Sequence, residues 1–142
     1  MNRAAVIDTN VVVAGLLTRP GDSPVVRVVD GMLAGSFRFL LSIELLEEYR
    51  RVLLRPRIAD RHGLSGERVD VILTEITANA MIREPVATGV PTAPDRGDDH
   101  LWRLLATTRD VVLVTGDRVL LEKPPDFASV ISPRQFVESL AR

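Results

Sequence analysis

The sequence has no cysteine, a single lysine and no long apolar run. The absence of cysteine excludes disulfide scaffolds, thiolate zinc sites and cysteine nucleophiles from this 142-residue chain. Lys123 is the only lysine among 18 basic residues and lies in a proline-rich segment, so lysine-based chemistry has one poorly placed candidate. The longest apolar runs, such as residues 11–17, are far shorter than the roughly 20 residues that span a bilayer. We therefore predict that the protein has no membrane-spanning segment.

The composition is otherwise that of an ordinary globular protein. Hydrophobic residues make up 46% and charged residues 26%, which excludes disorder of the whole chain. The length suits one domain, which we expect to cover residues 1–142. The N-terminal segment ending in Asp8 does not resemble a signal peptide, and together with the lack of cysteine this favours the cytoplasm. Because the net charge is −1, a nucleic-acid partner would have to be held by local groups.

Short apolar runs alternate with helical patterns along the chain. Strands are expected over residues 4–7, 37–41, 81–83, 111–114 and 128–131. Helices are expected over residues 11–17, 23–34, 43–54, 65–78 and 98–108, with a short turn after 117, a last helix from 133, and a connection over 56–64. Continuous apolar strands that alternate with helices predict a parallel sheet covered on both faces. We expect a three-layer α/β/α sandwich with about five strands.

Acidic residues follow three of the predicted strands. Asp8, Glu44 and Asp117 each lie just beyond a strand, and the carboxyl ends of parallel strands share one edge of the sheet. A fourth acidic group opens the helix near residue 98 and can point to the same edge; its members are Asp95, Asp98 and Asp99.

Each of these acids also lies near a predicted helix start, where a carboxylate stabilises by about 0.3–1 kcal/mol. Two carboxylates about 4 Å apart repel by roughly 4 kcal/mol at an effective dielectric constant of about 20, which exceeds that gain. A cluster of acids therefore needs a cation or shared protons to persist. Oxygen ligands without cysteine suit Mg²⁺ or Mn²⁺. Such a metal with carboxylates and no protein nucleophile favours hydrolysis of a phosphodiester, in which the metal activates water.

Five motifs occur in an order that resembles a known family. They are Val6-Ile7-Asp8-Thr9-Asn10, Ser42-Ile43-Glu44-Leu45-Leu46-Glu47-Glu48-Tyr49, Asp95-Arg96-Gly97-Asp98-Asp99, Val114-Thr115-Gly116-Asp117 followed by Leu120-Leu121, and Ile131-Ser132-Pro133-Arg134-Gln135-Phe136. The ordered set covers nearly the whole chain and resembles PIN-domain ribonucleases, specifically the VapC-like toxins of bacterial toxin–antitoxin pairs.

The resemblance implies roles for eight residues. By position, the family's catalytic, metal-binding acids match Asp8, Glu44, Asp99 and Asp117, with Asp98 as an adjacent metal ligand or alternative and Asp95 as a more distant one. Asn10 and Thr115 match polar positions that orient the carboxylates or the attacking water. The resemblance also implies an RNA substrate, a homodimer and a cognate antitoxin. The resulting hypothesis is a Mg²⁺- or Mn²⁺-dependent endoribonuclease.

Other interpretations remain open. The chain could be a non-catalytic PIN-like module that binds RNA or protein, with acids kept for stability or partner contacts. A haloacid-dehalogenase-type phosphatase is disfavoured because Asn10 stands where that chemistry uses a second aspartate. The arginines between residues 50 and 61 either hold RNA phosphates or form a solvated helix face. His100 is expected to face solvent, the alternative being that it approaches a metal or the scissile phosphate. Its apolar neighbours are expected in the core; they are Leu101, Trp102, Leu104 and Leu105.

Overall fold

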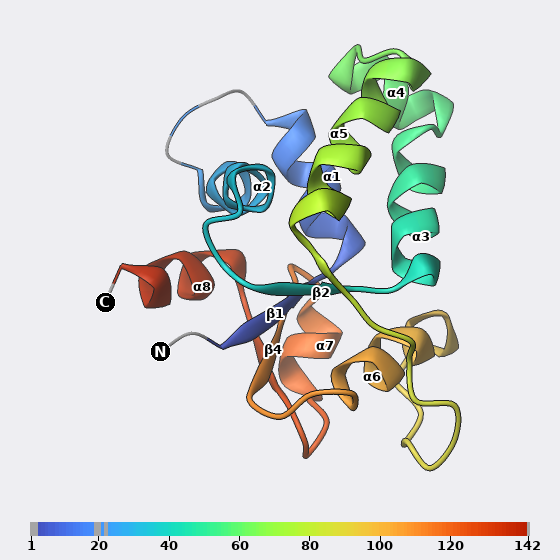
Figure 1. The fold of residues 1–142 in the computed structure, drawn as a ribbon, viewed down its shortest axis with the longest axis vertical. Helices are drawn as coiled ribbons and strands as arrows, with labels where there is room; N and C mark the ends of the chain where they lie inside the picture. The colour runs from blue at the N-terminus through green and yellow to red at the C-terminus, as the bar shows by residue number, and fades with distance from the viewer. Residues whose placement is uncertain (1–2, 19–20, 22, 142) are drawn as a thin grey trace.

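The computed structural model describes residues 3–18, 21 and 23–141, which form a parallel β-sheet flanked by helices (Figure 1). The sheet has five strands in the order β3-β2-β1-β4-β5, and every neighbouring pair is parallel. The strands are β1 (Ala4–Ile7), β2 (Phe39–Leu41), β3 (Met81–Ile82), β4 (Val111–Val114) and β5 (Ser129–Ile131). The predicted α/β class with a five-stranded parallel sheet is confirmed.

Helices cover both faces of this sheet. They are α1 (Thr9–Leu17), α2 (Pro24–Ala34), α3 (Ile43–Leu53), α4 (Pro56–His62), α5 (Gly66–Asn79), α6 (Asp99–Leu105), α7 (Arg118–Glu122) and α8 (Pro133–Leu140). In Figure 1, α1 to α5 lie on one side of the sheet and α6 and α7 on the other, while α8 packs against α2. Across the described ranges, no helix is both long and apolar enough to cross a bilayer.

The central strand β1 brings two distant segments together. It lies between β2 and β4, and its register pairs Ile7 with Val114. All residues of β1, β2 and β4 are buried, as expected for strands covered on both faces. Asp8, the next residue after β1, donates its backbone N–H to the Val114 carbonyl at 3.0 Å. The residues that follow β1 and β4 therefore meet at the carboxyl edge of the sheet.

Several predicted element ends differ from the structure, and two differences concern where a helix begins. The segment 56–64, expected as a connection, contains helix α4, because Pro56 occupies the first helical position as well as ending α3. Gly63 ends α4 in the left-handed conformation, with φ 68°. Helix α1 begins at Thr9 rather than Val11, and its N-cap is Asp8. Asp8, expected as a site acid near a helix start, is therefore also the cap of that helix.

Gly15 marks the closest approach of α1 and α2. A Cβ atom there would lie 2.4 Å from Val29 Cγ2 and 2.7 Å from the Val25 carbonyl oxygen. Alanine favours helix over glycine by about 1 kcal/mol, but this overpacking costs about 1–3 kcal/mol. We expect Gly15→Ala to lower the free energy of unfolding by about 1 kcal/mol in urea denaturation. The control is Gly66→Ala, whose Cβ would lie 3.9 Å from Leu54 Cδ2 and should not destabilise; equal effects would contradict the prediction.

Candidate active site

A pocket of about 460 Å³ lies at the carboxyl edge of the sheet. Carboxylates from four separate segments line it: the end of β1, the middle of α3, the turn before α6, and the end of β4. The lining residues are Asp8, Thr9, Asn10, Val13, Ala14, Leu17, Glu48, Arg51, Val52, Arg55, Asp98 and Asp117. The pocket is therefore lined by four acids, by apolar residues of α1 and by two arginines.

Asp8 is the most buried acid of the pocket, with 5% of its surface exposed. Its Oδ1 accepts the backbone N–H of Thr9 at 2.8 Å. Its Oδ2 accepts the Asn10 side-chain amide at 3.0 Å and the Thr115 hydroxyl at 2.7 Å. Three donors therefore fix both carboxylate oxygens. The orienting role predicted for Asn10 and Thr115 remains a prediction, but both side chains contact Asp8.

The same polar groups hold the loop that carries Asp117. Asn10 Oδ1 accepts the Gly116 N–H at 3.0 Å, and Thr115 Oγ1 accepts the Asp117 N–H at 3.0 Å. Asp117 in turn caps α7, accepting the Val119 N–H at 2.9 Å. One oxygen of Asp117 is thus occupied by a helix cap, while its carboxylate still lines the pocket.

The acid that α3 contributes is Glu48, one helical turn after the predicted Glu44. Glu44 is 58% exposed at its side chain, and its oxygens lie 3.9 Å from His100 Nδ1 and 4.0 Å from an Arg103 nitrogen. Glu48 is 19% exposed and its Oε1 accepts the Thr9 hydroxyl. Because α3 packs along α1, the residue opposite Asp8 lies within α3 rather than at its start. The repeat of acids four residues apart was the available sequence signal.

Among the three acids before and within α6, Asp98 lines the pocket. The predicted Asp99 instead accepts the Ala93 N–H at 2.7 Å, which ties down the preceding loop. The more distant alternative, Asp95, accepts the Gly97 N–H at 2.9 Å and caps the 3-10 turn (Arg96–Asp98). Asp98 makes no such capping bond. The structure thus brings Asp8, Asp98 and Asp117 together and leaves Glu44, Asp95 and Asp99 outside the pocket.

The pocket acids perturb one another's ionisation. Burial raises the pKa of Asp8, hydrogen bonds from Thr115 and Thr9 oppose this, and the charges of Glu48 and Asp117 raise it further. The pKa of Asp98 is raised to about 6, first by burial and then by the charge of Asp8. The charges of Asp95, Glu48 and Asp117 raise it further. These mutual shifts show negative charge that the protein itself does not neutralise.

Glu48 is the exception among these acids. A hydrogen bond from His100 lowers the pKa of Glu48. Burial opposes this shift, and the hydrogen bond from the Thr9 hydroxyl adds to it. Burial lowers the pKa of His100, but the hydrogen bond and charge of Glu48 outweigh it and the net pKa is raised. The two shifts agree: this contact favours a carboxylate next to an imidazolium.

The donor set suits a divalent cation. Within the described ranges, no three carboxylate or imidazole groups converge closely enough to form a complete metal site. The pocket nevertheless collects carboxylate oxygens, the donors that hard ions prefer, and Mg²⁺ commonly keeps several waters alongside one or two carboxylates. Burial is the main cause that raises the pKa values of Asp8 and Asp98, and a cation would relieve the repulsion between carboxylates that adds to it. The residues present therefore fit such an ion held partly through water.

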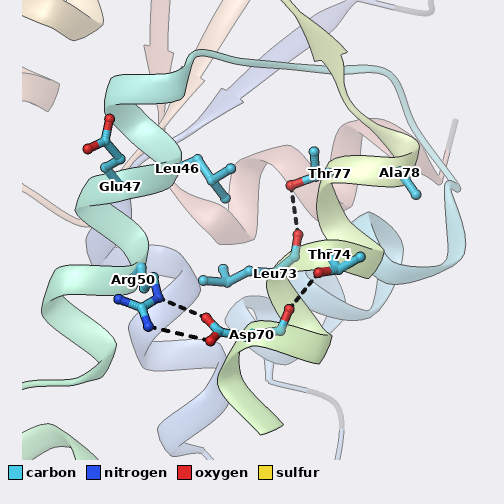
Figure 2. Close-up of a pocket in the computed structure, with 8 residues that line it drawn as sticks. All are labelled: Leu46, Glu47, Arg50, Asp70, Leu73, Thr74, Thr77 and Ala78. Atoms are coloured by element: carbon cyan, nitrogen blue, oxygen red, sulfur yellow. Dashed lines mark hydrogen bonds and ion pairs between the residues drawn. The ribbon is translucent and has the colours of Figure 1, made fainter. Parts of the chain in front are cut away.

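A second cavity, of about 610 Å³, lies between α3 and α5 but holds no comparable cluster. Figure 2 shows Arg50 paired with Asp70; Nε of Arg50 lies 2.8 Å from Oδ1 of Asp70. The hydroxyls of Thr74 and Thr77 donate to carbonyls of their own helix. These four polar side chains are paired with each other or with the backbone, so the acidic pocket is the stronger candidate for a functional site.

The apolar residues of α6 and both histidines are at least partly buried. Leu101, Trp102, Leu104 and Leu105 are buried, as predicted. His100 was expected to face solvent, and this is wrong: it is 3% exposed. The other histidine, His62, is structural, since Nε2 lies 2.8 Å from the Leu53 carbonyl and Nδ1 accepts the Leu64 N–H at 2.9 Å.

Fold and pocket together define an α/β protein with an acidic site at the carboxyl edge of a parallel sheet. A PIN-domain family model matches residues 4–119, so the chain belongs to the PIN-domain family. Proteins of this family are generally nucleases and usually use divalent metal ions. The PIN domain of RRP44 from T. brucei has a similar fold, with a TM-score of 0.54 and 12% identity over 99% of this chain and 82% of that chain. No curated protein matches the sequence.

Proposed function

We propose that this protein is a metal-dependent endoribonuclease that uses Mg²⁺ or Mn²⁺. The observation that supports the proposal best is the convergence of Asp8, Glu48, Asp98 and Asp117, from four segments of the chain, on one pocket. Capping alone does not account for this convergence, because Glu48 and Asp98 make no helix-capping bond. The proposed ligand set therefore differs from the sequence-based set by Glu48 in place of Glu44 and Asp98 in place of Asp99.

A divalent ion bound by these acids would neutralise phosphate charge and activate water for attack on the phosphodiester. The protein's own part is to hold the acids. Three donors fix Asp8, and its buried position keeps water from screening its charge. The Asn10 and Thr115 side chains connect Asp8 with the Asp117 loop, so one hydrogen-bond network holds both acids. Such a framework costs little reorganisation during the reaction.

Two arginines that line the pocket favour a nucleic-acid substrate. Arg51 and Arg55 line the pocket beside the acids, although the net charge of the chain is only −1. Arg51 Nη2 lies 4.0 Å from Glu48 Oε2, a weak pair in which the Arg51 side chain is 64% exposed. Guanidinium groups bind phosphate oxygens and position the backbone of a nucleic acid. They would offset the repulsion that a phosphodiester meets on approaching the carboxylates.

The proposal extends to a biological role through the sequence resemblance. We infer that the protein is the toxin of a toxin–antitoxin pair, acts in the cytoplasm as a homodimer and is inhibited by a cognate antitoxin. The neighbouring open reading frame provides the test: a small protein that, on co-expression, binds the chain and blocks RNA cleavage supports this role. Light scattering after gel filtration measures the dimer. If the protein cleaves RNA but no product of an adjacent reading frame inhibits it, the nuclease proposal stands and the toxin assignment is contradicted.

The nuclease proposal is tested by metal dependence. Protein stripped with EDTA should cleave labelled single-stranded RNA only after addition of Mg²⁺ or Mn²⁺. At about 100 times its Kd, Mn²⁺ should stabilise the fold by roughly 2.7 kcal/mol, which raises Tm on the order of 5–10 °C. The Asp8→Asn/Asp117→Asn double variant serves as the control and should show neither effect. A parent protein that shows no shift and no cleavage would instead support the non-catalytic binding module.

A further inference from the structure

The imidazole of His100 is buried beside the acidic pocket without lining it. Its Nε2 lies 3.1 Å from Oε2 of Glu48, and the side chain is 3% exposed. His100 is the second residue of α6, whereas Glu48 belongs to α3, so the contact joins elements 52 residues apart in the chain. The family match assigns no role to this histidine, and the sequence does not predict its contact with Glu48.

Both oxygens of Glu48 are held by other side chains. The Thr9 hydroxyl from α1 donates to Oε1, and the His100 imidazole contacts Oε2. A glutamate has three rotatable side-chain bonds, so without such partners its carboxylate would sample several orientations. Two contacts from two different helices restrict it to the orientation in which Glu48 lines the pocket with Asp8 and Asp98. Of these two contacts, only the one from His100 comes from the α6 side.

Packing alone gives a poor account of a histidine at this place. Burying a polar ring costs free energy unless its nitrogens are paired. Within the described residues, Nδ1 is buried and has no hydrogen-bond partner, its nearest charged neighbour being Glu44 Oε2 at 3.9 Å. A leucine or methionine would fill similar space without that cost. The retained function of the ring is therefore its Nε2 contact with Glu48.

We propose that His100 is a positioning residue that holds Glu48 in its metal-binding orientation. The inference rests on the proposed metal-dependent function, because it concerns how one of its ligands is aligned. His100 itself does not line the pocket and is not expected to touch substrate. A residue that orients a metal ligand in this way commonly contributes 10–100-fold to metal affinity or activity.

Two amide substitutions separate the hydrogen bond from the rest of the side chain. The amide nitrogen of glutamine reaches about as far from the backbone as histidine Nε2, whereas that of asparagine reaches only as far as Nδ1. We expect His100→Asn to weaken Mn²⁺ binding and lower kcat by about 10–100-fold with little change in KM for RNA. His100→Gln should restore both to within about threefold of the parent. His100→Leu removes the contact with Glu48 without burying an unpaired amide. It replaces His100→Asn in the experiment if the asparagine variant does not fold.

The measurements are Mn²⁺ titration by calorimetry and steady-state cleavage of labelled RNA, on variants whose folding is checked by circular dichroism. In a Glu48→Gln background, His100→Asn should produce no further loss of Mn²⁺ affinity, because it acts through Glu48. Equal Mn²⁺ affinities for the folded glutamine variant and the folded asparagine or leucine variant would overturn the inference while leaving the nuclease proposal intact. A parent protein that does not bind Mn²⁺ would overturn both.

Discussion

Asp8→Asn is expected to lower the rate of RNA cleavage in Mg²⁺ by at least about 100-fold, the scale on which a preorganised electrostatic group contributes to catalysis. Asparagine keeps the size of the side chain and retains an oxygen for the Thr9 N–H that Asp8 accepts in α1. It removes the negative charge that three donors hold at the carboxyl edge of β1. The loss should appear in kcat, because the charge acts on the metal and the reacting phosphate rather than on distant RNA contacts.

The matched control is Asp99→Asn. Asp99 carries the same charge but directs Oδ1 to the Ala93 N–H, and asparagine preserves an acceptor for that bond. Its cleavage rate should stay within a few-fold of the parent, as should that of Glu44→Gln, since Glu44 lies outside the pocket. Cleavage by Asp8→Asn at the parent rate would exclude the proposed mechanism. A large loss in Asp99→Asn with an active Asp98→Asn would return the third ligand to the position that the resemblance implies.

Local patterns in the sequence were sufficient to predict the parallel sheet and the edge at which Asp8 and Asp117 meet. The apolar runs of β1 and β4 end in polar residues, and parallel pairing brings those ends together whatever the loops between them do. Asp8 and Asp117 therefore could be placed at one edge from the sequence alone. The buried face of α6 was equally predictable, because its apolar residues recur with helical spacing.

The remaining site residues depend on how helices pack, which local patterns do not specify. Glu44 follows β2 as the pattern requires, yet the course of α3 along α1 places Glu48 opposite Asp8. Asp98 and Asp99 are neighbours with opposite roles, because the 3-10 turn ahead of α6 directs one side chain to the pocket and the other to the Ala93 backbone. His100 was misassigned for the same reason: its burial follows from the contact between α6 and α3.

Asp98→Asn is expected to change stability and function in opposite directions. In metal-free protein it should raise the free energy of unfolding by about 1 kcal/mol at pH 8, while weakening Mn²⁺ binding and cleavage by about 100-fold. Burial and the charges of Asp8, Asp95, Glu48 and Asp117 raise the pKa of Asp98 from 3.8 to about 6. That difference corresponds to roughly 3 kcal/mol, which solvent screening of this half-buried group reduces to about 1 kcal/mol.

The pH dependence follows from the direction of this shift. The folded protein binds the Asp98 proton more tightly than the unfolded chain, so ionisation of Asp98 reduces stability as pH rises from about 4 to about 6, and the loss persists above pH 6. Asparagine has no charge to lose, so its advantage over the parent should grow across that range and vanish below about pH 4. Urea denaturation in EDTA at several pH values measures it, with Asp99→Asn as the control that should bring no such gain. Equal stability of parent and Asp98→Asn at pH 8 would show that Asp98 is not repelled by its neighbours, and the electrostatic argument for a cation in this pocket would fail with it.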